Sequence, residues 1–318
     1  MIDIAVVGVG SIGVEHIRAI EKTNGCRLCA VCDTDKEKAA RTAEKYSVPW
    51  FADYRDIPGQ VQADAVILNL PHFLHAESAV FFLENGLHVL VEKPMANTIA
   101  ECDWMLRAAA SSGRRLAVGH LQRFFPANQA VRKLVDSAKF GRLCMFSERR
   151  TIDYFANERP RWFLDRAAAG GGIVMNYGAH MLDKLFYLTP SEDVAVFSSC
   201  GNAKAIGDIE GHAQILLKFS SGLSAAVTFS GYGPSGYDTM YYFTQGTARV
   251  TNGSVLSYTT DGEWHPAEVH NDGKHMERQL KAFCRYIRGE EADIATGEYG
   301  RRIVETIDRI YQAAGVSK

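Results

Sequence analysis

The fold is decided by one stretch, Ile4-Ala5-Val6-Val7-Gly8-Val9-Gly10-Ser11-Ile12-Gly13. Its apolar start predicts a strand, and the glycines follow at the spacing G-x-G-x-x-G, directly before a helical pattern. In such a turn the first glycine permits a tight bend, the second lets a pyrophosphate approach the backbone, and the third lets the helix pack on the strand. The stretch therefore predicts a dinucleotide-binding turn, with Gly8, Gly10, Ser11, Ile12 and Gly13 as the cofactor-binding residues.

An acidic residue supports the same interpretation. Asp33 ends the second predicted strand, Leu28 to Cys32, where a carboxylate can accept hydrogen bonds from the adenosine ribose. Asp33 and Asp35 would repel a 2′-phosphate, so NAD is favoured over NADP. NADP stays possible because Lys36, Lys38 and Arg41 follow on the next helix.

Outward from this stretch, apolar strands alternate with helical patterns as far as residue 118. Such units predict a doubly wound parallel sheet, an α/β Rossmann domain over residues 1–121. Longer β-type runs and two helical segments, 127–138 and 173–188, follow, with hairpin turn residues at Ser221-Gly222, Asn252-Gly253 and Asp261-Gly262. Residues 122–318 are therefore expected to form an α+β domain with a large, mainly antiparallel, open-faced sheet and helices on one face.

Composition excludes several function classes. The 318 residues include 35 Lys and Arg against 37 Asp and Glu, a net charge of −2, so we expect no nucleic-acid partner. The 47% hydrophobic share is globular and not that of a membrane protein. Seven cysteines and the absence of a cationic leader favour reduced thiols in the cytoplasm. Cys26, Cys29 and Cys32 have a spacing seen in redox and iron–sulfur motifs, but on a strand they cannot share one ion, so we expect no metal.

Two polar clusters could carry chemistry. Glu92-Lys93-Pro94 ends the strand His88 to Val91, on the side of a parallel sheet where ligands bind, so Lys93 could hold a substrate oxygen or form a surface ion pair. A triple glycine, 170–172, precedes a helix on which Asn176, His180 and Asp183 are expected to share one face. That stripe could contain a catalytic histidine, could face solvent, or could hold an internally satisfied histidine.

The chain resembles the glucose-fructose oxidoreductase and inositol dehydrogenase family, written Gfo/Idh/MocA. The resemblance rests on motifs in a fixed order: the glycine fingerprint, Pro71-His72-x-x-His75-Ala76, Glu92-Lys93-Pro94, Gln122-Arg123-Phe124, the triple-glycine helix and Thr296-Gly297-Glu298. It implies an NAD(P) Rossmann domain with Pro71, His75, Glu92 and Lys93 as further cofactor-binding residues, an open-faced sheet domain that often mediates homo-oligomers (dimers or tetramers), and hydride transfer at a secondary alcohol or ketone of a sugar or cyclic polyol.

The resemblance also implies roles for residues of the site. Lys93 and His180 match catalytic, substrate-contacting positions, and Asn176 stands where the family usually has Asp. Lys93 would stabilise the developing alkoxide and His180 would move the hydroxyl proton. Tyr237 resembles a substrate-side tyrosine of some inositol dehydrogenases, and Arg161 and Trp162 could shape the pocket, although packing or a surface loop would explain these three equally well.

Two other functions compete with a sugar or polyol dehydrogenase. One is an NAD-dependent glycoside-cleaving enzyme that uses transient oxidation, and the other is a ligand sensor that binds NAD without turnover. The glycoside-cleaving branch typically has a Tyr or Thr-His pattern after the glycines, which this sequence lacks. The presence of both Lys93 and His180 argues against a sensor, although fold alone cannot decide between these functions.

Overall fold

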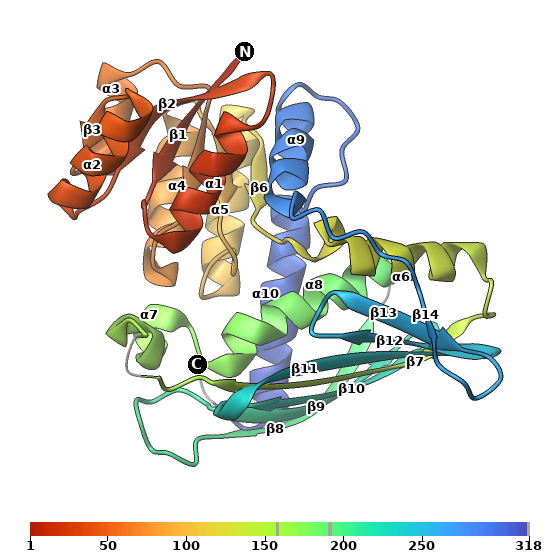
Figure 1. The fold of residues 1–318 in the computed structure, drawn as a ribbon. Coiled ribbons are helices and arrows are strands. Elements are labelled where there is room, and N and C mark those ends of the chain that lie inside the picture. The colour runs from red at the N-terminus through yellow and green to blue at the C-terminus, as the bar shows by residue number, and fades with distance from the viewer. Residues whose placement is uncertain (157–158, 190–192, 317–318) are drawn as a thin grey trace. The chain divides into compact units, whose positions relative to one another are not determined.

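The computed structural model describes residues 1–156, 159–189 and 193–316, which form two compact units (Figure 1). The first unit contains Met1–His120 and Lys274–Val304, and the second contains Leu121–Gly273 and Glu305–Lys318. The first boundary falls one residue before the expected one. The segment Lys274–Val304 differs from the expectation, because its backbone binds the first unit: the Val118 N–H donates to the Ala295 carbonyl at 2.8 Å.

The first unit is built on a six-stranded parallel sheet with the order β3-β2-β1-β4-β5-β6. Its strands are β1 (Ile2–Val7), β2 (Cys26–Cys32), β3 (Trp50–Phe51), β4 (Ala65–Leu68), β5 (His88–Val91) and β6 (Leu116–Val118). Its helices are α1 (Ser11–Glu21), α2 (Lys36–Tyr46), α3 (Ile57–Gln60), α4 (His75–Glu84), α5 (Ile99–Ser112), α9 (His275–Ile287) and residues 297–304 of α10 (Gly297–Ala313). The order reverses between β1 and β4, which confirms the predicted doubly wound topology.

Local sequence signals fix these elements. Helix α5 begins at a capping box in which Thr98 and Glu101 bind each other's backbone N–H, and it ends at Gly113 in the left-handed conformation. Strands β4 and β5 are apolar and almost wholly buried, as strands covered on both faces must be. Strand β3 was not predicted, because it is only two residues long and leaves too short a pattern in the sequence.

The three closely spaced cysteines lie on β2, as predicted. All are free thiols, and burial raises the pKa of both Cys29 and Cys32 to about 12. Nowhere in residues 1–156, 159–189 and 193–316 do three or more His, Cys, Asp or Glu side chains gather as metal ligands would.

The second unit is built on an eight-stranded sheet with the order β14-β13-β12-β11-β7-β10-β9-β8. Its strands are β7 (Leu143–Asp153), β8 (Val194–Gly201), β9 (His212–Phe219), β10 (Ser224–Ser230), β11 (Tyr232–Phe243), β12 (Gly246–Thr251), β13 (Val255–Thr259) and β14 (His265–Pro266). All neighbours are antiparallel except β7 and β10. The mainly antiparallel sheet is therefore confirmed, and the turn expected at Asn252-Gly253 joins β12 to β13.

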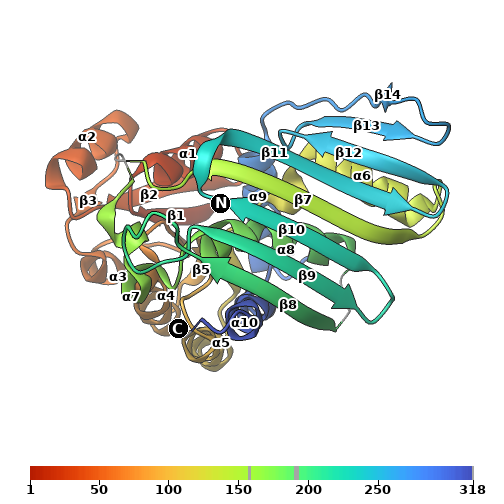
Figure 2. The ribbon, with the colours of Figure 1, turned by 90° about the horizontal axis from the view of Figure 1, so that it is seen from below.

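Helices cover one face of this sheet, and the other face is open (Figures 1 and 2). They are α6 (Pro126–Ser137), α7 (Arg166–Ala169), α8 (Ala179–Leu188) and residues 305–313 of α10. On β9 the buried and exposed residues alternate, with Ile215 facing the helices and Leu216 facing out. The helix expected over 173–188 begins with a π-helical turn, Val174–Gly178, before α8.

A buried ion pair joins α8 to the covered face of the sheet. The Nζ atom of Lys184 lies 2.6 Å from a Glu148 carboxylate oxygen, and both side chains are at most 2% exposed. Lys184 also donates to the Thr239 hydroxyl at 3.1 Å and to the Tyr237 hydroxyl. Burial alone would lower the pKa of Lys184, but Glu148 raises it above its usual value, so this lysine is charged.

In the part of the chain that the structure describes, no helix is both long and apolar enough to span a membrane.

We expect Lys184→Met to lower the free energy of unfolding by about 3–5 kcal/mol, because it leaves the Glu148 carboxylate buried without a partner. Urea unfolding measures this value. The double variant Lys184→Met/Glu148→Leu should recover most of the loss. The control Arg149→Met breaks an exposed pair with Asp238 and should change stability by about 1 kcal/mol or less. A single variant as stable as the native protein would contradict this account.

Candidate functional site

The glycine turn of the first unit requires residues without side chains. Gly8 has a φ of 83°, and a Cβ atom there would lie 2.3 Å from the Asn69 carbonyl oxygen. A Cβ atom on Gly13 would lie 2.0 Å from the Gly8 carbonyl oxygen, so α1 packs directly on the turn. Among the described residues, no atom lies within 4 Å of the same position on Gly10. The turn is therefore closed at Gly8 and Gly13 and open at Gly10.

The N-terminus of α1 is suited to an anion. Gly10 is its N-cap and provides no side-chain hydrogen bond, and the first turn carries no acidic residue. Ser11 and Ile12, the first two residues of α1, are exposed. Because backbone N–H groups and the helix dipole both favour negative charge there, these residues fit the pyrophosphate of a dinucleotide.

Asp33 is fixed beside the glycine turn. One carboxylate oxygen accepts the Val9 N–H at 3.0 Å, and the other accepts the Asp35 N–H at 3.0 Å. Each oxygen retains a lone pair for a ribose hydroxyl. The Nζ atom of Lys38 lies 3.6 Å from Asp33, so a cation is close to the position where NADP would carry its extra phosphate.

Glu92 orients the chain at the carboxyl end of β5. Its carboxylate lies 3.0 Å from Nε2 of His16 on α1 and accepts the Lys93 N–H at 3.2 Å. Burial alone would raise the pKa of Glu92, but His16 and Lys93 hold it below its usual value. A Cβ atom on Gly119, the residue directly after β6, would lie 2.6 Å from this carboxylate, so glycine is needed here. Glu92 is therefore charged and rigid, and Lys93 directly follows it.

His75 clamps the other side of Lys93. Its two ring nitrogens lie 2.8 Å from the carbonyl oxygens of Pro94 and Leu70. Burial lowers the pKa of this ring, against the effect of both carbonyls. A neutral ring has one N–H and donates to one of the two carbonyl oxygens. Pro71 caps the short 3₁₀ turn that precedes His75. The clamp holds the segment after β5 against the segment after β4.

In the second unit, a buried carboxylate caps the helix that carries His180. Glu210 accepts the N–H groups of Gly172 and Val174 at 2.9 Å, and the Tyr311 hydroxyl donates to it at 2.8 Å. A Cβ atom on Gly171 would lie 1.9 Å from the Tyr311 hydroxyl, and one on Gly172 would lie 2.1 Å from the Glu210 carbonyl oxygen. The glycines thus let Glu210 and Tyr311 reach the helix start.

Asn176 lies in the π-helical turn, and His180 lies on α8 directly after it. Asn176 is buried. Burial raises the pKa of Tyr154, and the Arg159 guanidinium and a hydrogen bond with the Asn176 amide act in the opposite direction. His180 is partly exposed, with its ring 6.4 Å from that of Tyr177. Asp183 does not serve the predicted polar stripe.

Asp183 has a structural role instead. It is fully buried, accepts the Gln122 N–H at 2.9 Å and lies 3.4 Å from the Arg123 guanidinium. His180, three residues earlier on α8, is partly exposed, so the predicted stripe of Asn176, His180 and Asp183 is mostly internal and does not face solvent as a whole.

The remaining predicted residues fall into two places. Tyr237 lies on β11, where its hydroxyl contacts Lys184 and its ring centre is 4.7 Å from the Arg150 guanidinium. Arg161 and Trp162 lie on a 3₁₀ turn, Arg161–Leu164, where Arg161 is exposed and Trp162 stacks on Phe163 at 3.8 Å. The structure thus joins Tyr237 to the helix of His180 through Lys184.

Sequence reasoning missed several residues that shape these places: His16, Asn69, Glu148, Arg150, Lys184 and Glu210. A signal existed for some of them. His16 interrupts the buried face of α1, and Lys184 stands in an otherwise apolar helix. Charged or titratable side chains at such positions need partners, but the partners lie far away in sequence.

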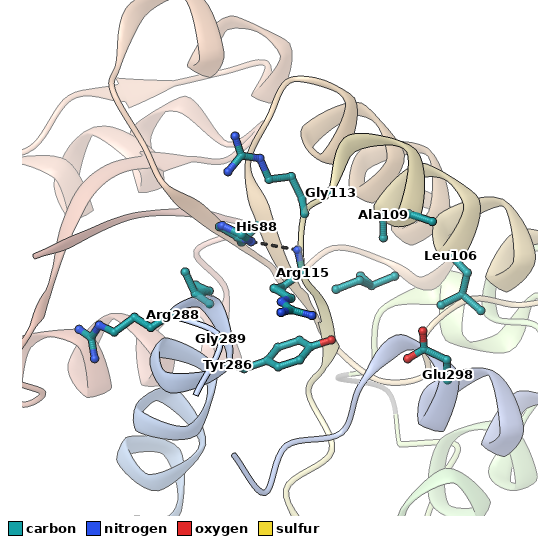
Figure 3. Close-up of a pocket in the computed structure, with 13 residues that line it drawn as sticks. His88, Leu106, Ala109, Gly113, Arg115, Tyr286, Arg288, Gly289 and Glu298 are labelled. Atoms are coloured by element: carbon teal, nitrogen blue, oxygen red, sulfur yellow. Dashed lines mark hydrogen bonds between the residues drawn. The ribbon is translucent and has the colours of Figure 1, made fainter. Parts of the chain in front are cut away.

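A groove of about 560 Å³ opens elsewhere on the first unit (Figure 3). It is lined by His88, Arg115, Tyr286, Arg288 and Glu298, among others, and Arg115 lies over the Tyr286 ring. His88 and Leu116 begin β5 and β6, so the groove lies at the amino ends of these strands. Ligands of parallel sheets bind at the carboxyl ends, so this groove is not the cofactor site.

Two family models match the chain. The oxidoreductase family model, an NAD-binding Rossmann fold of the Gfo/Idh/MocA group, matches residues 2–120, and a C-terminal domain model of the same group matches residues 128–254.

Relatives with assigned activities and solved structures agree with these matches. A 1-carboxy-3-chloro-3,4-dihydroxycyclohexa-1,5-diene dehydrogenase of Comamonas testosteroni is 33% identical over 72% of this chain and 58% of its own length. The D-glucoside 3-dehydrogenase of Escherichia coli is 25% identical over 98% of this chain and 95% of its own. An aldose-aldose oxidoreductase from Caulobacter crescentus superposes with a TM-score of 0.89 at 25% identity, covering 99% of this chain and 97% of its own.

The glycine turn and Asp33 fit NAD, and the matches span both units. The chain belongs to the Gfo/Idh/MocA family of NAD-binding oxidoreductases.

Proposed function

We propose that this oxidoreductase transfers a hydride between NAD and a secondary alcohol or ketone on a sugar or cyclic polyol. The observation that carries the proposal is the rigid placement of Lys93, held between the Glu92–His16 contact and the His75 clamp at the carboxyl end of the NAD-binding sheet. NAD supplies the hydride acceptor or donor when it is bound. The names of the glucoside and carboxylated cyclic diol dehydrogenases support ring hydroxyls as the reacting groups.

In this proposal Lys93, in its charged form, donates a hydrogen bond to the reacting oxygen. The cation stabilises negative charge that develops as the C–H bond breaks. Glu92 favours the charged form of its neighbour and fixes the backbone from which Lys93 extends. His75 and Pro71 hold that backbone, and because His75 is fully buried we assign it an indirect role in cofactor binding.

His180 removes the hydroxyl proton during oxidation and returns one during reduction. Its neutral imidazole can accept the proton and pass it to solvent, because the side chain is partly exposed. Asn176 lies one turn earlier and carries no charge, so it can help to orient the site but cannot stabilise an imidazolium as a carboxylate would. Tyr237, Arg161 and Trp162 remain candidates for contacts with the rest of the substrate.

The two competing functions give different products. A glycoside-cleaving enzyme would release an aglycone from a glycoside without net formation of NADH, whereas a dehydrogenase forms NADH in proportion to ketone. A sensor would bind NAD and a polyol with no product. The presence of both Lys93 and His180 favours the dehydrogenase.

The open face of the second unit supports a homo-oligomer. Met145, Phe197, Leu216 and Val255 are exposed large apolar side chains, and strand alternation and register put them on the face that the helices leave uncovered. Exposed apolar residues on a broad sheet face are typical of subunit interfaces. We propose that this face joins copies of the chain into dimers or tetramers.

Lys93→Ala should lower kcat by about 10²- to 10³-fold, because the stabilising cation is lost from the reacting oxygen. NAD affinity, followed by quenching of protein fluorescence, should stay within about twofold of native since Lys93 acts on the substrate. Steady-state NADH formation measures kcat, and Lys281→Ala, an exposed lysine on α9, is the control. Unchanged turnover would remove Lys93 from the mechanism.

Coenzyme preference should depend on Asp33. The double change Asp33→Ser/Thr34→Arg removes a carboxylate and adds a guanidinium, so it should shift the kcat/KM ratio towards NADP by about 10-fold or more. Asp33→Ser alone should lower kcat/KM with NAD, and it should raise kcat/KM with NADP less than the double change does. Both ratios come from initial rates with each coenzyme. A native enzyme that already prefers NADP would show that this assignment is wrong.

The native protein should have the mass of a dimer or tetramer in multi-angle light scattering at micromolar concentration. Phe197→Glu/Leu216→Glu places two charges on the open face and should shift the mass to that of one chain while preserving NAD binding. A native mass of one chain, or a variant that keeps the native mass, would contradict an interface on this face.

A further inference from the structure

The covered face of the second sheet carries a row of residue pairs that becomes more polar along β7 and β11. Tyr241 pairs with Phe146, then Thr239 with Glu148, and then Tyr237 with Arg150. The first pair is fully buried, whereas Arg150 and Tyr237 are half-buried. Figure 1 shows α8 over this part of the sheet. The row therefore leads from the apolar core to a partly open end at Arg150.

At that end the Arg150 guanidinium contacts two tyrosine rings. Its central carbon lies 4.2 Å from the ring centre of Tyr177 and 4.7 Å from that of Tyr237. Such contacts occupy the faces of a guanidinium and leave the N–H groups at its edge able to donate. Within residues 1–156, 159–189 and 193–316, Arg150 forms no ion pair or hydrogen bond through these donors.

The nearby charges leave an excess of positive charge. Glu148, the inward-facing carboxylate two residues before Arg150 on β7, forms its ion pair with Lys184. Asp183 binds Gln122 and Arg123, and Asp238 faces the other side of the sheet with Arg149. A second guanidinium, Arg159, lies 4.1 Å from the Tyr154 ring, which contacts the Tyr177 ring at 6.1 Å. A negative group is thus what this surface lacks.

Tyr177 links this surface to the catalytic helix. It stands between Asn176 and His180 in sequence, and its ring contacts both the His180 ring, at 6.4 Å, and the Arg150 guanidinium. The turn at Gly253 also supports the arrangement, because a Cβ atom there would lie 3.1 Å from the Tyr237 ring. A group bound by Arg150 would therefore belong to the same molecule that His180 serves.

We infer that Arg150 is a substrate-binding residue that recognises a carboxylate, and that the substrate is an acidic polyol such as a uronic acid or a carboxylated cyclic diol. This inference rests on the proposed dehydrogenase function and narrows its substrate class. The planar, fork-shaped donors of a guanidinium match a carboxylate with two parallel hydrogen bonds. Its position on a rigid strand between two rings orders that fork before the substrate arrives, which reduces the entropy lost on binding.

Matched substrates test the inference. Rates of NADH formation are compared for D-glucuronate against D-glucose and for D-galacturonate against D-galactose, with D-glucose 6-phosphate as a further anion. The native enzyme should favour each uronate by about 10- to 100-fold in kcat/KM. Arg150→Met should lose that preference, mainly through a higher KM for the uronates. Arg150→Lys should retain part of the preference because it keeps the charge but loses the fork.

Arg149→Met is the control. Arg149 is the neighbouring arginine on β7, but it is exposed on the opposite face and paired with Asp238, so its loss should not change the uronate preference. Equal or better use of neutral sugars by the native enzyme would overturn the inference and leave the proposed function intact. A preference for glucose 6-phosphate over glucuronate would overturn the carboxylate assignment.

A binding measurement distinguishes a failure of the Arg150 inference from a failure of the proposed dehydrogenase function. Isothermal titration of the NAD-loaded protein with D-glucuronate should give an affinity that falls by about 10-fold or more in Arg150→Met but not in Arg149→Met. If no sugar yields NADH but this difference appears, the proposed function fails and carboxylate recognition stands. If glucuronate binds the native protein and Arg150→Met equally, or binds neither, carboxylate recognition by Arg150 is wrong.

Discussion

The ion pair between Lys184 and Glu148 is the interaction on which the geometry of the second unit depends. It joins α8 to β7 in the interior, where neither charge could remain without the other. The same lysine reaches Thr239 and Tyr237 on β11, so one side chain fixes a helix against two strands. Lys184 takes the ion pair of Glu148, and the next inward residue of β7, Arg150, forms no ion pair among the described residues.

In the first unit, the glycine turn depends on the close approach of backbone segments. In the second unit, the position of α8 depends on a buried ion pair. At Gly8 and Gly13 the backbone of the turn, the helix and Asn69 come so close that no side chain fits, which leaves the N–H groups at the start of α1 open. Near β5, the His16–Glu92 contact and the His75 clamp fix the backbone from which Lys93 extends. Lys93 and Arg150 thus each extend from a rigid support, which is the arrangement that catalysis and recognition by charge require.

Local signals predicted the parallel sheet, the glycine turn and most helices, because strand alternation, capping residues and glycine spacing are properties of short segments. The π-helical turn before α8 escaped prediction, since its sequence is compatible with a regular helix. Arg150 and Glu148 could not be assigned from sequence, because their meaning comes from Tyr237, Lys184 and Tyr177, which β pairing and helix packing bring to them from distant positions. Glu210 likewise explains the triple glycine only once the fold is known.

The account is tested most directly by following a labelled hydrogen. D-Glucuronate carrying deuterium at every carbon-bound position is incubated with the protein and NAD, and the reduced cofactor is analysed by mass spectrometry. Direct transfer from a secondary alcohol carbon of an acidic polyol predicts NADH that contains one deuterium, together with a ketone product, and neither product in Lys93→Ala at the same enzyme concentration and time. Unlabelled NADH, or no NADH with glucuronate when neutral polyols give it, would contradict the account.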